Sequence, residues 1–163
     1  MTSNFLLFKK QLGNVYAFRL FLFTKVPAAF FAGVRLERLE MEESAISVRY
    51  NWFTKNPFRS VYFAVLLMPA EISTGILCMG HLYKRNPGVS MLLIHSEGNF
   101  IKKATGKITF TSANGLMIGE AIDKAVSTGE ATTVRCYCLG KNETQETVAE
   151  FYFTWSFKIR TRA

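Results

Sequence analysis

One acidic residue stands alone in a long apolar stretch of the chain. Glu71 is the only charged residue in positions 60–83, a stretch whose composition predicts a helix. A carboxyl group in apolar surroundings has a raised pKa and few competing partners, which suits a general base. The free N–H groups at the helix start, around Tyr62 and Phe63, could hold a developing negative oxygen. The sequence therefore predicts a base and an oxyanion site on one helix.

These two groups lie too far apart to act together within one chain. Glu71 follows Tyr62 by nine residues, which is about 13 Å along a helix. A purely structural interpretation also stays open, in which Glu71 is held by Ser73, Thr74 or an arginine side chain. Tyr62 could likewise be a core aromatic residue with a satisfied hydroxyl group.

The elements around this helix are predicted from periodicity and turn residues. Asn56-Pro57 and Asn86-Pro87-Gly88 mark turns on either side of the helix over residues 60–83. Apolar alternation predicts strands over residues 34–39, 43–52, 89–101, 104–112, 132–139 and 148–160, and helical spacing predicts a helix over residues 114–127. In the strand over 43–52, Ile46, Val48, Tyr50 and Trp52 are expected on one face.

The last strand has the clearest period of two. Ala149, Phe151, Phe153, Trp155, Phe157 and Ile159 share one face, and polar residues occupy the other. Strands with one apolar face are typical of an antiparallel sheet that is covered on one side. We therefore expect an α+β domain in which an antiparallel sheet wraps around the long central apolar helix. The predicted division is an N-terminal helical extension over 1–32 and one domain over 33–163.

Two segments are apolar enough to raise the question of a membrane. Residues 5–33 are interrupted by Arg19 and Lys25 and broken by Pro27, which argues against a signal peptide. We expect this segment to be a helix packed on the domain, with contact to a membrane surface as an alternative. The segment 60–83 is long enough to span a bilayer, but Glu71 at its centre favours a buried helix.

Composition bounds the function classes. The chain of 163 residues carries a net charge of +8, which favours an anionic partner such as a phosphate-bearing small molecule, a membrane surface or a nucleic acid. An odd count of three cysteines predicts a reducing, cytoplasmic location. Cys136 and Cys138 lack a second pair or a neighbouring histidine, so we expect core residues and no metal site.

The order of elements resembles the hotdog fold. Within that superfamily the chain is similar to acyl-CoA thioesterases of the phenylacetate-pathway type, in a poorly characterised subgroup with Asn-Pro-Phe before the helix. The family pattern is an asparagine, then His-Gly-Gly at the helix start, then an acid further along that helix. Asn56, Tyr62 and Glu71 have the family spacing, with Tyr62-Phe63-Ala64 in place of His-Gly-Gly. Gly88-Val89-Ser90 matches a family Gly-Val-Ser.

The resemblance implies roles for these residues. Glu71 would be the general base, Asn56 would orient water or the thioester, Tyr62 would mark the oxyanion site, and Ser90 would assist near Glu71. The resemblance also implies a homodimer or a dimer of dimers, because in hotdog dimers the helix start of one subunit faces the acid of the other. Candidates for binding the phosphates of coenzyme A, here part of the substrate, are Lys84, Arg85, Lys102 and Lys103.

Three functions therefore remain open, in descending order. The first is hydrolysis of an acyl-CoA thioester. The second is a non-catalytic protein that binds an acyl group or lipid, because Tyr62 and Phe63 are bulky where the family has small residues. The third is nucleic-acid binding, which the absence of basic clusters longer than two residues makes least favoured.

Overall fold

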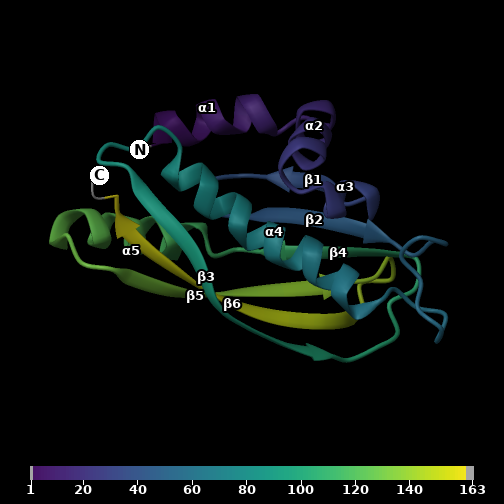
Figure 1. Ribbon diagram of the computed structural model, residues 1–163. Helices are drawn as coiled ribbons and strands as arrows, with labels where there is room; N and C mark the ends of the chain where they lie inside the picture. Colours follow the sequence, from purple (N-terminus) through teal and green to yellow (C-terminus); the bar gives the residue numbers. More distant parts are fainter. Residues whose placement is uncertain (1, 161–163) are drawn as a thin grey trace.

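The structure, a computed structural model, describes residues 2–160 (Figure 1). Both predicted segments, 1–32 and 33–163, reach residues outside this range. The helices are α1 (Thr2–Leu12), α2 (Val15–Lys25), α3 (Pro27–Phe31), α4 (Phe63–Leu82) and α5 (Gly115–Thr128). The strands are β1 (Arg35–Leu39), β2 (Ser44–Arg49), β3 (Val89–Phe100), β4 (Lys107–Ser112), β5 (Thr132–Lys141) and β6 (Thr147–Ile159).

The six strands form one antiparallel sheet around α4. Their order is β1-β2-β4-β5-β6-β3, so β1 and β3 are the two edges. Figure 1 shows α4 running across the sheet, with α2 and α3 near β1 and α1 lying along the same side. The helix α5 lies on the opposite side of α4, where it contacts β5 and β6. The predicted α+β fold, a sheet wrapped around a long apolar helix, is confirmed.

α4 is a core helix by its surroundings. It is long and apolar enough to cross a membrane, but 67% of its most apolar window is buried inside the fold. The inward residues of β6 pack opposite it, and Phe151, Phe153, Trp155 and Phe157 are buried as the period of two predicted. An apolar helix surrounded by a sheet buries its hydrophobic surface within the protein and needs no lipid around it.

The strand predicted over 43–52 is shorter in the structure than its apolar alternation indicates. β2 ends at Arg49, and Trp52 is an exposed turn residue rather than an inward-facing one. The Oδ1 atom of Asn51 accepts hydrogen bonds from the N–H groups of Phe53 (2.8 Å) and Thr54 (3.1 Å). This side-chain turn diverts the backbone from the ladder, so the prediction for Trp52 was wrong.

The N-terminal segment folds as three helices that pack on the domain. Asn14 caps α2 by accepting from the N–H of Ala17 at 2.9 Å, and Pro27 starts α3. The helix α1 packs against α4, and α2 packs against β1. Phe18 and Leu22 of α2 belong to the core of the whole protein.

This packing predicts that the N-terminal helices unfold together with the sheet. Phe18→Ala should lower the free energy of unfolding by about 3–5 kcal/mol, because it leaves a cavity at a buried site. Phe23→Ala, on the exposed side of the same helix, should change it by no more than about 0.5 kcal/mol. Urea unfolding followed by fluorescence measures both. Equal effects of the two substitutions would mean that α2 is not part of the cooperative core.

Candidate active site

Glu71 lies in the middle of α4, beside the indole of Trp155. A Cβ atom placed on Gly75 would lie 3.2 Å from Glu71 Oε1 and 3.4 Å from Trp155 Cζ2. The carboxylate therefore occupies the space that Gly75, one turn further along the helix, leaves open. Trp155 belongs to β6, next to the edge strand β3, and pairs with Leu93 of β3. Glu71 is thus one strand away from the free edge of the sheet.

The hydroxyl groups next to Glu71 are bound elsewhere. Ser73 Oγ donates to the carbonyl oxygen of Ala70 at 2.7 Å. Thr74 Oγ1 donates to the backbone carbonyl of Glu71 at 3.0 Å and accepts from Trp155 Nε1 at 2.9 Å. Within residues 2–160, no hydrogen bond or ion pair reaches the Glu71 carboxylate. Ser73 and Thr74, the partners that a structural role of Glu71 would require, therefore do not hydrogen-bond its carboxylate.

Burial raises the pKa of Glu71 above its ordinary value of 4.5. Loss of hydration is the cause, because no neighbouring charge or hydrogen bond contributes. Glu71 as a whole residue is half-buried rather than fully enclosed, which leaves room for a water molecule beside it. A raised pKa and access to water are the properties that a general base requires.

The start of α4 carries two backbone N–H groups without an acceptor. Tyr62 N–H donates to the carbonyl oxygen of Thr54 at 2.8 Å, and Val65 N–H donates to that of Tyr62 at 2.9 Å. No capping side chain binds the helix start. The N–H groups of Phe63 and Ala64 therefore have no acceptor in the described part of the chain. They lie at the positive end of the helix dipole, where an anionic oxygen is stabilised.

Asn56 organises the loop that leads into α4. Its Oδ1 atom accepts from the N–H groups of Phe58 (2.9 Å) and Ser60 (3.2 Å), and its Nδ2 donates to Ser60 Oγ at 3.0 Å. These bonds form an Asx turn. Asn56 and Ser60 also line a cavity of about 310 Å³ at the helix start, together with Phe63 and Phe100. The structure thus brings Asn56 to the helix start, not to Glu71.

Ser90 lies on the opposite face of the sheet from Glu71. It pairs with Lys158 of β6 and donates to that carbonyl oxygen at 3.0 Å. The next pair, Met91 and Phe157, points inward, where Phe157 is fully buried. Because side chains alternate along a strand, Ser90 points away from α4. Within one protomer, the structure does not bring Ser90 to Glu71.

The two basic pairs lie at opposite ends of α4. Lys102 and Lys103 follow β3 and line the cavity at the helix start, where Lys102 Nζ forms an ion pair with Glu146 at 2.5 Å. Lys84 and Arg85 follow the last turn of α4. A helix of 20 residues is about 30 Å long. One phosphate group therefore cannot use both pairs of a single protomer.

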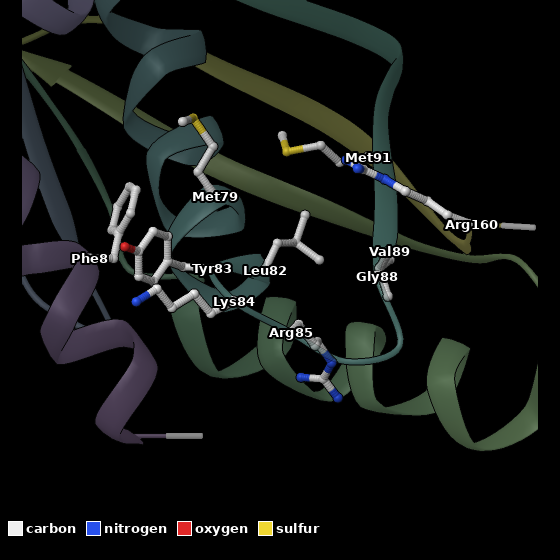
Figure 2. A pocket seen from close by; sticks show the side chains of 10 residues that line it. All are labelled: Phe8, Met79, Leu82, Tyr83, Lys84, Arg85, Gly88, Val89, Met91 and Arg160. Atoms are coloured by element: carbon white, nitrogen blue, oxygen red, sulfur yellow. The ribbon is translucent and has the colours of Figure 1, made fainter. Parts of the chain in front are cut away.

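Lys84 and Arg85 line a second cavity, of about 420 Å³. Figure 2 shows Arg160 entering it from the end of β6 and the Arg85 guanidinium pointing toward α5, where it pairs with Asp123. The wall is otherwise apolar, formed by Phe8, Met79, Leu82, Val89 and Met91 among others. Arg160 was missed at the sequence level, because only the fold brings the end of the chain to the end of α4.

Gly75 and Trp155 were also missed as site residues. A glycine inside a helix carries a sequence signal, since it lowers helix stability and often marks a close approach. Trp155 carries none beyond its inward-facing position in β6. His81 is a packing residue, because its Nε2 hydrogen-bonds the Met41 carbonyl oxygen at 3.1 Å and burial lowers its pKa.

Comparison with known proteins shows the fold. No protein-family model and no curated protein matches the sequence. A protein of unknown function from Pseudomonas aeruginosa, named a "probable thioesterase", aligns with a TM-score of 0.74 at 19% identity, over 88% of this chain and 95% of its own. A thioesterase from Haemophilus influenzae aligns with a TM-score of 0.62 at 12% identity, over 90% of this chain and 91% of its own.

A third structure, a protein of unknown function from Chlorobaculum tepidum, aligns with a TM-score of 0.74 at 10% identity, over 87% of this chain and 92% of its own. The chain has a hotdog fold. In this fold the central helix is α4, and its start and its middle carry the oxyanion candidates and Glu71. At these identities, the roles of individual residues rest on the geometry of the chain itself.

The raised pKa of Glu71 predicts a stability effect that is independent of any activity. Below pH 4.5 the carboxyl group is protonated in both states and costs nothing. Above pH 4.5 the unfolded chain ionises while the folded protein still holds its proton, so stability is lost over this interval, and the loss is complete once the pH has risen through the folded-state pKa. Glu71→Gln should therefore raise the melting temperature at neutral pH, and the difference should vanish below pH 4.5.

Thermal unfolding over a pH series measures this difference, with Glu120→Gln on the exposed side of α5 as the matched control. The control should leave the melting temperature unchanged throughout. A lower melting temperature of Glu71→Gln at neutral pH would instead show that the carboxylate has a stabilising partner.

Proposed function

We propose that the protein hydrolyses acyl-CoA thioesters, in line with its resemblance to the Asn-Pro-Phe subgroup of phenylacetate-pathway-type thioesterases. The observation that carries the proposal is an unpartnered carboxylate, Glu71, inside an apolar helix whose start offers free N–H groups at Phe63 and Ala64. Keeping such an acid costs stability, and a structural role does not explain it. Thioesterases among the proteins with a similar fold agree with this chemistry.

In the proposed reaction, a water molecule between Glu71 and the substrate attacks the thioester carbonyl carbon. Glu71 takes one proton from that water as the new carbon–oxygen bond forms. The N–H groups of Phe63 and Ala64 stabilise the negative oxygen of the tetrahedral intermediate. The carbon–sulfur bond then breaks, the proton passes from Glu71 to the leaving sulfur, and an acid and a free thiol result.

The active unit in this proposal is a dimer. The edge strand β1 is short and carries Arg35, Glu37 and Arg38, charges that protect a sheet edge. The other edge, β3, has 12 residues and exposes Leu92 (65%) and Ile94 (50%). A long edge strand with exposed apolar side chains favours pairing with a second copy of itself.

Antiparallel pairing of two β3 edges would bring the helix start of one subunit toward Glu71 of the other. The helix start lies beside the end of β3, where the Phe63 and Phe100 rings are 6.2 Å apart. Along β3, Glu71 lies at the height of Leu93, because Glu71 is beside Trp155 and Trp155 pairs with Leu93. A two-fold axis near the middle of the span 93–100 therefore places these two levels opposite each other.

Lys102 and Lys103 are the stronger candidates for the phosphates of coenzyme A. They line the cavity at the helix start, next to the free N–H groups. Lys84 and Arg85 lie beyond the other end of α4. The alternative proposal, a non-catalytic acyl-binding protein, draws on the exposed rings of Tyr62 and Phe63 at the helix start, which narrow the space for a thioester.

The first kinetic prediction concerns Glu71. With a panel of acyl-CoA substrates, from short to long and aryl, free thiol release should be fastest for one acyl class. Glu71→Gln should lower kcat about a hundred- to ten-thousand-fold, the usual contribution of a general base. Because the carboxylate form is active and burial raises its pKa, the acid limb of the pH–rate profile should lie above pH 4.5. Co-purified acyl ligand without turnover would favour the binding protein instead.

The second kinetic prediction concerns the backbone of Phe63. Proline is tolerated at the first position of a helix and has no N–H group, so Phe63→Pro removes an oxyanion donor with little effect on α4. It should lower kcat about a hundred- to a thousand-fold. Phe63→Ala, which removes the ring and keeps the N–H, is the matched control and should retain most of the rate. Equal losses in both variants would assign the effect to the ring.

Mixing the two variants tests the shared site. A heterodimer of Glu71→Gln and Phe63→Pro subunits contains one site with both groups intact. Half of the randomly paired dimers are heterodimers, so activity should return to about a quarter of the wild-type level. Failure to recover any activity, with mixing verified by mass spectrometry, would contradict a site built across two subunits.

A further inference from the structure

The outer side of α2 carries an apolar stripe that nothing within residues 2–160 covers. Tyr16, Leu20 and Phe23 recur at the spacing of one helix face, and they are 87%, 64% and 54% exposed. The opposite side of α2, with Phe18 and Leu22, is fully buried. A surface helix normally turns polar residues to the solvent, so this second apolar face indicates a partner.

The same property extends to the neighbouring helices. Further large apolar side chains are exposed on all three N-terminal helices, at Leu6, Leu7, Val15 and Phe31. Seven such residues therefore fall within the first 31 positions of the chain. This is a denser exposed apolar surface than single scattered hydrophobic residues produce.

The N-terminal helices themselves carry charge of one sign. Residues 1–36 contain five basic residues and no aspartate or glutamate. Lys9 is paired with Glu40, and the Arg19 guanidinium lies over the Phe30 ring at 4.4 Å. Lys10 and Lys25 form no ion pair among residues 2–160. Two uncompensated lysines therefore border exposed apolar side chains.

We propose that the outer face of α2, with its basic border, binds the surface of an anionic lipid membrane. Apolar and tyrosine side chains enter the interface, and lysines contact the lipid phosphates. A second copy of this chain fits less well, because self-association through this face would bring the basic border of one copy against the basic border of the other. This inference stands apart from the proposed hydrolase activity, since it uses none of the residues of that site.

The position of the stripe leaves the candidate active site free. The helix α2 packs against β1 (Figure 1), at the opposite end of the strand order from β3, whereas α1 packs on α4 and its Phe8 lines the cavity shared with Val89 and Met91 of β3. A protein bound through α2 therefore keeps its β3 edge and the Glu71 region accessible. Membrane binding and pairing through β3 can occur at the same time.

Vesicle co-sedimentation of the full chain tests the proposal. The protein should bind vesicles of mixed phosphatidylcholine and phosphatidylglycerol, and binding should fall with added salt and be weak on phosphatidylcholine alone. Tyr16→Ser/Leu20→Gln/Phe23→Gln should lower the partition coefficient at least tenfold. Lys10→Glu/Lys25→Glu should lower it about fivefold or more per lysine on the anionic vesicles only.

The matched control is Leu116→Gln/Met117→Gln, which removes two exposed apolar residues from α5. It should bind as the wild type does, and circular dichroism should show that all variants are folded. Absence of binding to anionic vesicles, or equal binding by the stripe variant, would overturn the proposal. So would a larger wild-type assembly in solution that the stripe substitutions dissociate, since the face would then be an interface between copies.

Discussion

The structure depends on the burial of one helix that is apolar on every side. Twelve of the 20 residues of α4 are buried, and a helix without a polar face needs apolar neighbours all round it. The sheet provides them by curving so that β2, β4, β5 and β6 all contact the helix, while α1 and α5 close the remaining sides. Glu71 is the exception within this arrangement, and its raised pKa is a consequence of the same burial. The burial that forms the core is therefore also the cause of the raised pKa of Glu71.

Much of the fold could be predicted because burial leaves a clear pattern in the sequence. The central helix was located from its composition, since it lacks charges except Glu71, and β6 was located from its alternation. The strand ending at Trp52 was misjudged, because the apolar alternation continues past the point where the Asn51 side chain turns the backbone. A side chain that hydrogen-bonds nearby backbone N–H groups competes with strand pairing. Such a side chain leaves little signal in the sequence pattern, but it decides where the strand ends. The three-helix division of the N-terminal segment depends on Asn14 and Pro27 in the same way.

The candidate site was predictable only in part, for a related reason. Glu71 is conspicuous by its isolation along the sequence, whereas Gly75 and Trp155 matter because of where the fold places them. Ser90 and Asn56 show the converse. Their spacing fits a family pattern, but the alternation of side chains along β3 turns Ser90 outward. The Asn56 side chain is hydrogen-bonded to Phe58 and Ser60 of its own loop. Spacing along a chain locates a residue on an element, and the side chain's direction follows from pairing and burial.

The two sheet edges give the molecule two different sides. β1 is short and charged, and α2 packs against it, so that edge is protected. β3 is long, partly apolar and paired only with β6. Two of the exposed apolar surfaces, on β3 and on the outer face of α2, accordingly lie at opposite ends of the strand order. An extended edge strand presents unpaired backbone N–H and C=O groups, which another strand satisfies and lipid does not. The outer face of α2 presents side chains only, because its backbone groups are already bonded within the helix. The chemistry of the two surfaces therefore agrees with protein pairing through β3 and lipid contact through α2, as proposed.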